Sequence, residues 1–236
     1  MSHATGTVRL TAERRFFATA AAVAAALAFA GFAPTYYLKG FFGTPALPGL
    51  VHVHGLVMTL WIVLFATQVG LVAARRTDLH RKLGVAGVVL AAAVVVVGVV
   101  TAIEGAKRGV SPGPPPLVFM AIPIGVVLVF GVLVGAAIAL RRRSDWHKRL
   151  MLLGSIAVLT PAIARLPIDA LHAGGIVAFM GLTDLFAIAC VAVDTLRNRR
   201  LHPAFGWGAL FLLLSHPVML AIAGSAWWKS VATRLV

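Results

Sequence analysis

Polar residues are sparse along this chain, and they separate long apolar runs. A bilayer core about 30 Å thick requires about 20 apolar residues per membrane-spanning helix. Seven runs of suitable length follow one another, over residues 16–37, 50–74, 83–103, 116–140, 150–167, 174–195 and 203–225. The pattern therefore predicts an all-α fold, a polytopic bundle of seven transmembrane helices, with residues 1–236 as a single transmembrane domain.

The overall composition agrees with this prediction. Hydrophobic residues make up 60% of the 236 residues and charged residues only 12%, and the mean hydropathy is +0.96. Soluble domains are typically about 45–50% apolar and about 25% charged. This composition excludes an ordinary soluble protein and leaves little chain for a separate soluble domain.

The basic residues predict the orientation in the membrane. Most of the 21 Lys and Arg stand before the first run or just after the second, fourth and sixth runs. The positive-inside rule makes these connections cytoplasmic, so we expect a cytoplasmic N-terminus and a periplasmic C-terminus in a bacterial inner membrane. The net charge of +14 then comes mainly from basic residues in the cytoplasmic loops, which contact the anionic headgroups of lipids. We therefore expect no nucleic-acid partner.

A short charged sequence motif recurs at the start of helices that are predicted to run outward from the cytoplasmic side. Residues 76–84 read RTDLHRKLG and residues 143–151 read RSDWHKRLM, while residues 199–206, RRLHPAFG, form a weaker copy. The recurrence suggests an internal repeat of helical hairpins. Thr77-Asp78 and Ser144-Asp145 stand where helix N-caps are expected, since their side-chain oxygens can accept from the free amides of the first turn and the aspartate charge suits the positive end of the helix dipole.

Each copy of the motif contains a histidine, at position 80, 147 or 202. Helix capping does not require a histidine at these positions. His80, His147 and His202 are flanked by Arg or Lys, whose positive field disfavours a bound metal cation. These histidines are either part of the interface structure or contact an anion, such as a lipid phosphate, a haem propionate or a charged substrate head. We expect an anion contact at the cytoplasmic face as their functional role.

Ionisable residues inside membrane spans are costly and mark functional sites. The chain places His54, Arg165, Asp184 and His216 within its runs, with His52 near His54 and with Asp169 and His172 in the adjoining outer turn. A helical rise of about 1.5 Å per residue puts His54 and Arg165 roughly 5 to 8 Å below the outer boundary, and Asp184 and His216 roughly 12 to 16 Å below it. Asp184 is expected to accept a hydrogen bond from His216 and to orient its ring.

His54 shares a helix face with Met58, Trp61 and Phe65. Such a stripe is typical of ordinary helix packing, but it also suits the wall of a site for a flat cofactor such as haem b, with Arg165 on a propionate. His52 lies about 200° around the helix from His54, so only one of the two histidines can face one ligand.

The stretch VHVHGLVMTLWIVLFATQ, followed by RTDLHRKLG and DWHKRLM, resembles a family of bacterial multi-span membrane proteins of unassigned function, with HxHG, LHRKLG and HKRLM signatures. The resemblance covers roughly residues 50–167 and implies a multi-span membrane fold. More loosely, the histidine signatures are similar to those of b-type transmembrane cytochromes and of haem and cytochrome-oxidase assembly proteins. That likeness implies haem ligation by His54 and His216.

Three functional interpretations follow. The leading one is a redox protein that binds haem or a quinone through His54, His216 and Arg165, lined by His52, Met58 and Trp61, with Asp184, Asp169 and His172 as a proton relay or as supporting residues. The second is a membrane hydrolase that holds zinc with His54, His216 and Asp184. The third is a protein that binds or transports a small hydrophobic molecule without chemistry.

Overall fold

The computed structural model describes residues 2–236, and their side chains from residue 11 onward. The described residues form helices and no strand. Six segments are long and apolar enough to cross a membrane: Thr11–Tyr37, which combines part of α1 (Ser2–Phe32) with η1 (Ala33–Tyr37), α2 (Gly49–Ala73), α3 (Thr77–Lys107), α4 (Pro116–Ala139), α8 (Gly175–Asn198) and α9 (Pro203–Ala223). The protein is an all-helical, multi-pass membrane bundle.

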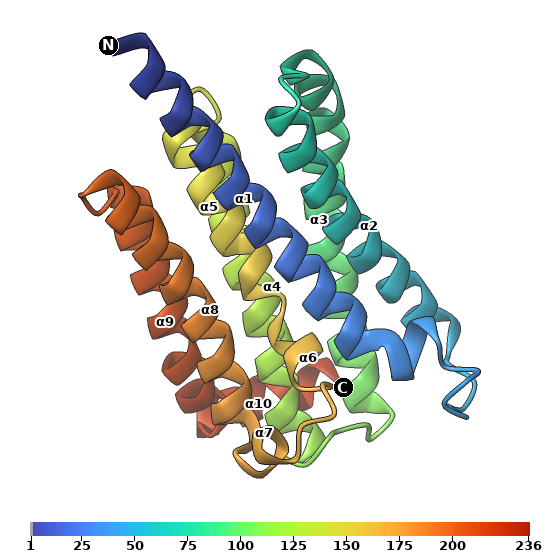
Figure 1. Ribbon diagram of the computed structural model, residues 1–236. Coiled ribbons are helices and arrows are strands. Elements are labelled where there is room, and N and C mark those ends of the chain that lie inside the picture. The colour runs from blue at the N-terminus through green and yellow to red at the C-terminus, as the bar shows by residue number, and fades with distance from the viewer. Residues whose placement is uncertain (1) are drawn as a thin grey trace.

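The helices run between two ends of different character (Figure 1). One end holds the N-terminus and the connections α2–α3, α4–α5 and α8–α9, which carry Arg75, Arg76, Arg141, Arg142, Arg143, Arg199 and Arg200; we call it the basic end. At the opposite end, α10 (Ala226–Leu235) lies across the bundle, and the indole of Trp228 donates to the carbonyl of Leu117 on α4 at 2.7 Å.

The fifth predicted run, residues 150–167, is not one continuous helix. Its residues lie in α5 (Ser144–Ala157), in the single turn α6 (Thr160–Ile163) and in the irregular segment after it. The break precedes Pro161, which has no N–H to donate to the preceding turn, so the chain makes a tighter turn in which Leu159 bonds Ile156. Together, α5 and α6 still lead from the basic end toward the opposite end (Figure 1).

Helix starts differ from the predicted caps. Helices α3 and α5 begin at Thr77 and Ser144, so Arg76 and Arg143 occupy the N-cap positions and make no side-chain cap bond. The predicted caps at Thr77-Asp78 and Ser144-Asp145 are therefore wrong, because the helices start earlier than such caps require. Asp78 and Asp145 do lie in the first turns of α3 and α5, where a negative charge suits the helix dipole. A histidine caps α9 instead: His202 Nδ1 accepts from the amide of Ala204 at 3.1 Å.

The core is centred on α4 and α5. Phe130 on α4 and Leu152, Leu153 and Ile156 on α5 are completely buried. Helices α2 and α3 lie to one side, packed on each other and on α4, and their outward faces expose large apolar residues such as Val89 and Val96. This arrangement places α5 in the interior, where its polar residues meet those of α8 and α9.

Candidate functional sites

Asp184 and His216 form a pair in the interior of the bundle. Asp184 Oδ1 on α8 lies 2.9 Å from His216 Nδ1 on α9, and His216 is only 4% exposed. The two atoms are at hydrogen-bond distance but are not aligned as a hydrogen bond. A proton on Nδ1 and a small rotation of the ring would complete a charge-assisted bond to the carboxylate. The sequence predicted that these two residues lie at the same depth, and the structure shows that they face each other from the neighbouring helices α8 and α9.

His54 has a different set of neighbours. The Arg165 guanidinium lies within electrostatic range of the His54 ring, and His54 Nδ1 is buried with no hydrogen-bond partner among the described residues. Arg165 donates to the carbonyl of Pro161 at 2.7 Å and stacks over the ring of Phe32, 4.8 Å from its centroid. The guanidinium is thus held by α6 and by the end of α1.

The stripe below His54 faces the protein interior and is packed. Trp61 and Phe65 are 2% and 5% exposed, and the Trp61 ring meets the Phe130 ring edge-on with centroids 4.7 Å apart. Beside His54, the ring of Tyr36 occupies the space next to Gly55, so that even a methyl group there would collide with it. These contacts fill the wall that a macrocycle would need, so the residues around His54 do not fit haem as they stand.

The other outer residues lie at the surface. The exposed His52 side chain lies beside Tyr36, with ring centroids 5.9 Å apart, and the tyrosine hydroxyl donates to the His52 carbonyl at 3.2 Å. His172 Nε2 lies 3.2 Å from the carbonyl oxygen of Ala164, and exposed Asp169 begins the short helix α7 (Asp169–Ala173).

In the part of the chain that the structure describes, no three His, Cys, Asp or Glu side chains gather into a group that could hold a metal ion. Asp184 and His216 are one pair, and His54 lies with Arg165 instead.

At the basic end, the repeated histidines come together. The rings of His80 and His147 meet edge-on with centroids 6.3 Å apart, although 67 positions separate them in the sequence. The third histidine, His202, contacts the neighbouring ring of Trp146 with centroids 5.8 Å apart. The starts of α3, α5 and α9 therefore converge through their aromatic side chains.

A partly open cavity lies beside this convergence, between α2, α3, α4 and α5. Its volume is about 60 Å³. Its lining comprises Trp61, Leu64, Phe65, Gln68, Gly84, Gly87, Val88, Ile138, His147 and Met151. Two of these residues, Trp61 and Gln68, each carry a buried polar atom, Nε1 and Oε1 respectively, that has no hydrogen-bond partner among the described residues.

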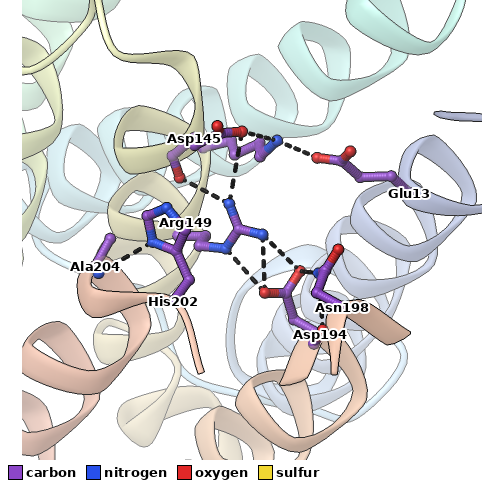
Figure 2. Close-up of polar contacts among 8 residues, drawn as sticks. Glu13, Asp145, Arg149, Asp194, Asn198, His202 and Ala204 are labelled. Atoms are coloured by element: carbon purple, nitrogen blue, oxygen red, sulfur yellow. Dashed lines mark hydrogen bonds and ion pairs between the residues drawn. The ribbon is translucent and has the colours of Figure 1, made fainter. Parts of the chain in front are cut away.

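A buried ion pair joins α5 to α8 at the same end (Figure 2). Arg149 donates from Nε and Nη2 to the two carboxylate oxygens of Asp194, each at 2.9 Å, and the two residues are 4% and 0% exposed. The remaining Arg149 nitrogen donates to the carbonyl of Asp145 at 3.0 Å, while Asn198 donates to Asp194 Oδ1 at 3.1 Å. The buried charges are therefore both paired and hydrogen-bonded, as burial requires.

Ionisable groups around this pair extend it to the surface. Lys148 forms an ion pair with Asp145, with 2.7 Å between Nζ and Oδ1, and a second ion pair with Glu13 on α1. The hydrogen bond from Lys148 lowers the pKa of the Asp145 carboxyl below its ordinary value. For His202, partial burial and then the positive charge of Arg149 lower the pKa, while Asp145 and Asp194 oppose this shift.

The sequence analysis counted Arg149 only among the basic residues at the predicted cytoplasmic side and gave Gln68 no role. One signal was available for the ion pair: Arg149 stands one turn inside α5 and Asp194 one turn before the end of α8, so both are charged groups set within helices at the same end of the bundle. The partner of each, and the cavity beside Gln68, depend on how distant helices pack.

Comparison of the chain with family models, with curated proteins and with solved structures found no match.

Proposed function

We propose that this protein is a redox protein of the bacterial inner membrane that works with a small hydrophobic carrier of the quinone class. The six apolar helices support a membrane location. The proposal adds a seventh crossing made by α5 and α6 together, and it places the basic end in the cytoplasm because Lys and Arg accumulate on that side of inner-membrane proteins.

The observation that carries the proposal is the Asp184–His216 pair. A histidine that is 4% exposed and lies 2.9 Å from a carboxylate can exchange a proton inside the bundle without leaving an isolated charge there. Ionisable groups are expensive within a membrane, and pairs of this kind mark proton or ligand pathways. Pro217, directly after His216, removes a backbone donor and loosens the helix around it.

The chemistry of a quinone explains why such a pair is useful. Reducing a quinone to a hydroquinone takes up two electrons and two protons, and oxidation releases them. A protein that works with this carrier therefore needs side chains that accept and release protons inside the bilayer. Asp184 orients His216 and balances its charge when the ring is protonated, so the pair serves as one proton-exchanging unit.

The test uses the full chain purified in mild detergent. One sample is divided for absorption spectra in the oxidised and dithionite-reduced states, for metal analysis, and for organic extraction with detection of quinones. We expect a quinone in the extract, and we expect proton uptake on its reduction to slow at least tenfold in Asp184→Asn and His216→Gln. Glu104→Gln changes an exposed carboxylate on α3, outside the residues assigned to the site, and serves as the matched control.

Two results would overturn the proposal. One is a sample with neither a co-purifying quinone nor any spectral change on reduction. The other is a quinone-containing sample in which Asp184→Asn and His216→Gln take up protons at the same rate as the wild type and Glu104→Gln. A haem absorption band would mean that the redox cofactor is haem rather than a quinone. Stoichiometric zinc would favour the hydrolase interpretation instead.

A further inference from the structure

Arg165 is held in a fixed position at the end of the bundle opposite the basic end (Figure 1). Its Nη1 donates to the carbonyl of Pro161 at 2.7 Å, and its guanidinium stacks over the ring of Phe32 on α1, 4.8 Å from the ring centroid. These two contacts fix the guanidinium between α6 and the end of α1. The side chain is nevertheless exposed on the outside of the bundle.

The charge of Arg165 has no counter-ion within the described part of the chain. None of the ion pairs found there includes Arg165, and its Nε and Nη2 make no hydrogen bond there either. These two nitrogens form the edge of the guanidinium that matches two oxygens of a carboxylate or a phosphate. Arg149 uses the same edge to bind the carboxylate of Asp194. In Arg165 this edge is available to a ligand.

His54 supplies a second donor beside this guanidinium. It lies on α2, within electrostatic range of Arg165, and it is not ion-paired with any described carboxylate. Its Nδ1 is buried, whereas its Nε2 is accessible and has no hydrogen-bond partner among the described residues. A proton on Nε2 therefore places the N–H of the neutral ring where a ligand can reach it.

Large apolar side chains are exposed at the same end of the bundle. Phe41 and Phe42, in the turn that follows η1, are 89% and 60% exposed, and Ile168 stands exposed three residues after Arg165. Thr44 donates to the carbonyl of Pro34 at 2.7 Å, which holds this turn against η1. Exposed side chains of this kind at the ends of membrane-spanning helices are more stable among lipids than in water. The surroundings of Arg165 therefore suit a lipid.

From these observations we propose that Arg165 and His54 bind the phosphate group of a phospholipid in the leaflet at this end of the bundle. Arg165 donates from Nε and Nη2 to the two free phosphate oxygens, and His54 Nε2 donates to one of the same oxygens. The phosphate balances the charge of the guanidinium, and the acyl chains lie along the apolar outer surface. The site is separate from the Asp184–His216 pair and does not depend on a redox role.

The test reads binding at this site alone, because phospholipids also contact the basic end. In a Cys190→Ala background, Ile168→Cys carries a bimane fluorophore, and the full chain in detergent is titrated with phosphatidylcholine that bears a nitroxide on its headgroup. We expect saturable quenching of the fluorescence. Dioctanoyl phosphatidylglycerol should reverse it by competition, whereas dioctanoylglycerol, which lacks the phosphate, and inorganic phosphate, which lacks the chains, should not.

Substitutions at the two donors identify what holds the phosphate. Arg165→Gln should raise the lipid concentration for half-quenching at least about tenfold, because it removes a charge-assisted pair of hydrogen bonds. Arg165→Lys keeps the charge but not the two parallel donors, so its loss should be smaller. His54→Phe removes one donor and should weaken binding by up to about tenfold. Arg108→Gln removes an exposed arginine after α3 and should bind as the unsubstituted protein does.

Thermal unfolding followed by circular dichroism shows whether each variant is folded. The phosphate site is excluded if folded Arg165→Gln and Arg165→Lys are both quenched at the same lipid concentration as Arg108→Gln. Competition by dioctanoylglycerol equal to that of phosphatidylglycerol would reduce the contact to acyl chains. Competition by inorganic phosphate alone would make the ligand a free anion instead of a lipid. Unchanged binding in His54→Phe would contradict the two-residue site.

Discussion

Arg149 on α5 donates hydrogen bonds to both carboxylate oxygens of Asp194 on α8, each at 2.9 Å, although 45 positions separate the two residues (Figure 2). The guanidinium also lies over the ring of Phe205 at the start of α9, 5.6 Å from its centroid. One side chain therefore connects three helices at the basic end, and its charge is compensated within the protein.

Breaking this ion pair from one side should destabilise the protein strongly. Asp194→Leu or Arg149→Met leaves the other charge buried and unpaired, which costs about 3–5 kcal/mol. The double variant removes both charges and should recover most of that loss. The measurement is unfolding in detergent, detected by a thiol-reactive dye at Cys190, the only cysteine of the chain.

The exposed pair of Lys107 and Glu104, at 3.1 Å, provides the control, since Glu104→Gln should change stability by no more than about 1 kcal/mol. Single variants at Arg149 and Asp194 that are as stable as this control would contradict the structural role of the buried pair.

His202 should make stability depend on pH. Burial and the charge of Arg149 lower its pKa against the opposing effect of Asp145 and Asp194, with Lys148 also nearby. The folded protein then binds fewer protons than the unfolded chain, so stability is full above the ordinary histidine pKa of about 6.5 and falls as the pH drops through the lowered value. Asp145, whose pKa is also lowered, extends the loss in the same direction at more acidic pH.

Two substitutions at position 202 separate titration from capping. His202→Asn preserves a side-chain acceptor for the Ala204 amide, so it should keep wild-type stability at pH 8 and lose less stability between pH 7 and pH 5. His202→Ala should show the same reduced slope but lose about 1 kcal/mol at every pH because the cap is gone. A slope in His202→Asn equal to that of the wild type would assign the pH dependence to other groups.

The contact between α1 and α6 should tolerate no side chain at Gly31. A methyl group at this position would collide with the backbone carbonyl of Ala162, and backbone atoms cannot move aside as a flexible side chain can. We expect Gly31→Ala to lower the free energy of unfolding by about 1–3 kcal/mol. Gly70→Ala places the same methyl group in open space and should be neutral or slightly stabilising, so equal effects of the two substitutions would argue against this close packing.

The proposed seven crossings can be counted by chemical labelling in whole cells. In a Cys190→Ala background, single cysteines replace Arg142 at the basic end, Val110 between α3 and α4, or Ser230 after α9, all of which are exposed. A membrane-impermeant maleimide should label positions 110 and 230 from outside and position 142 only after lysis. Protection of position 230 would mean that α5 and α6 do not complete a crossing.

Much of the fold follows from local physics and could be predicted. Apolar runs of membrane length become helices because every backbone polar group must be satisfied within the bilayer. The inward stripe of Trp61 and Phe65 follows from helical periodicity, and both side chains are buried. Depth along the helices also predicted that Asp184 and His216 lie at one level, and the structure places them 2.9 Å apart.

What the sequence by itself determined is therefore the class of protein, the sequence of its apolar helices, and the charged residues that gather at one end. Only the tertiary structure decided that His80 meets His147, that Arg149 binds Asp194, and that Tyr36 fills the space beside His54. These contacts join residues far apart in the chain. They depend on which helices become neighbours and on how each is rotated, and both are set by packing of the whole bundle rather than by any local pattern.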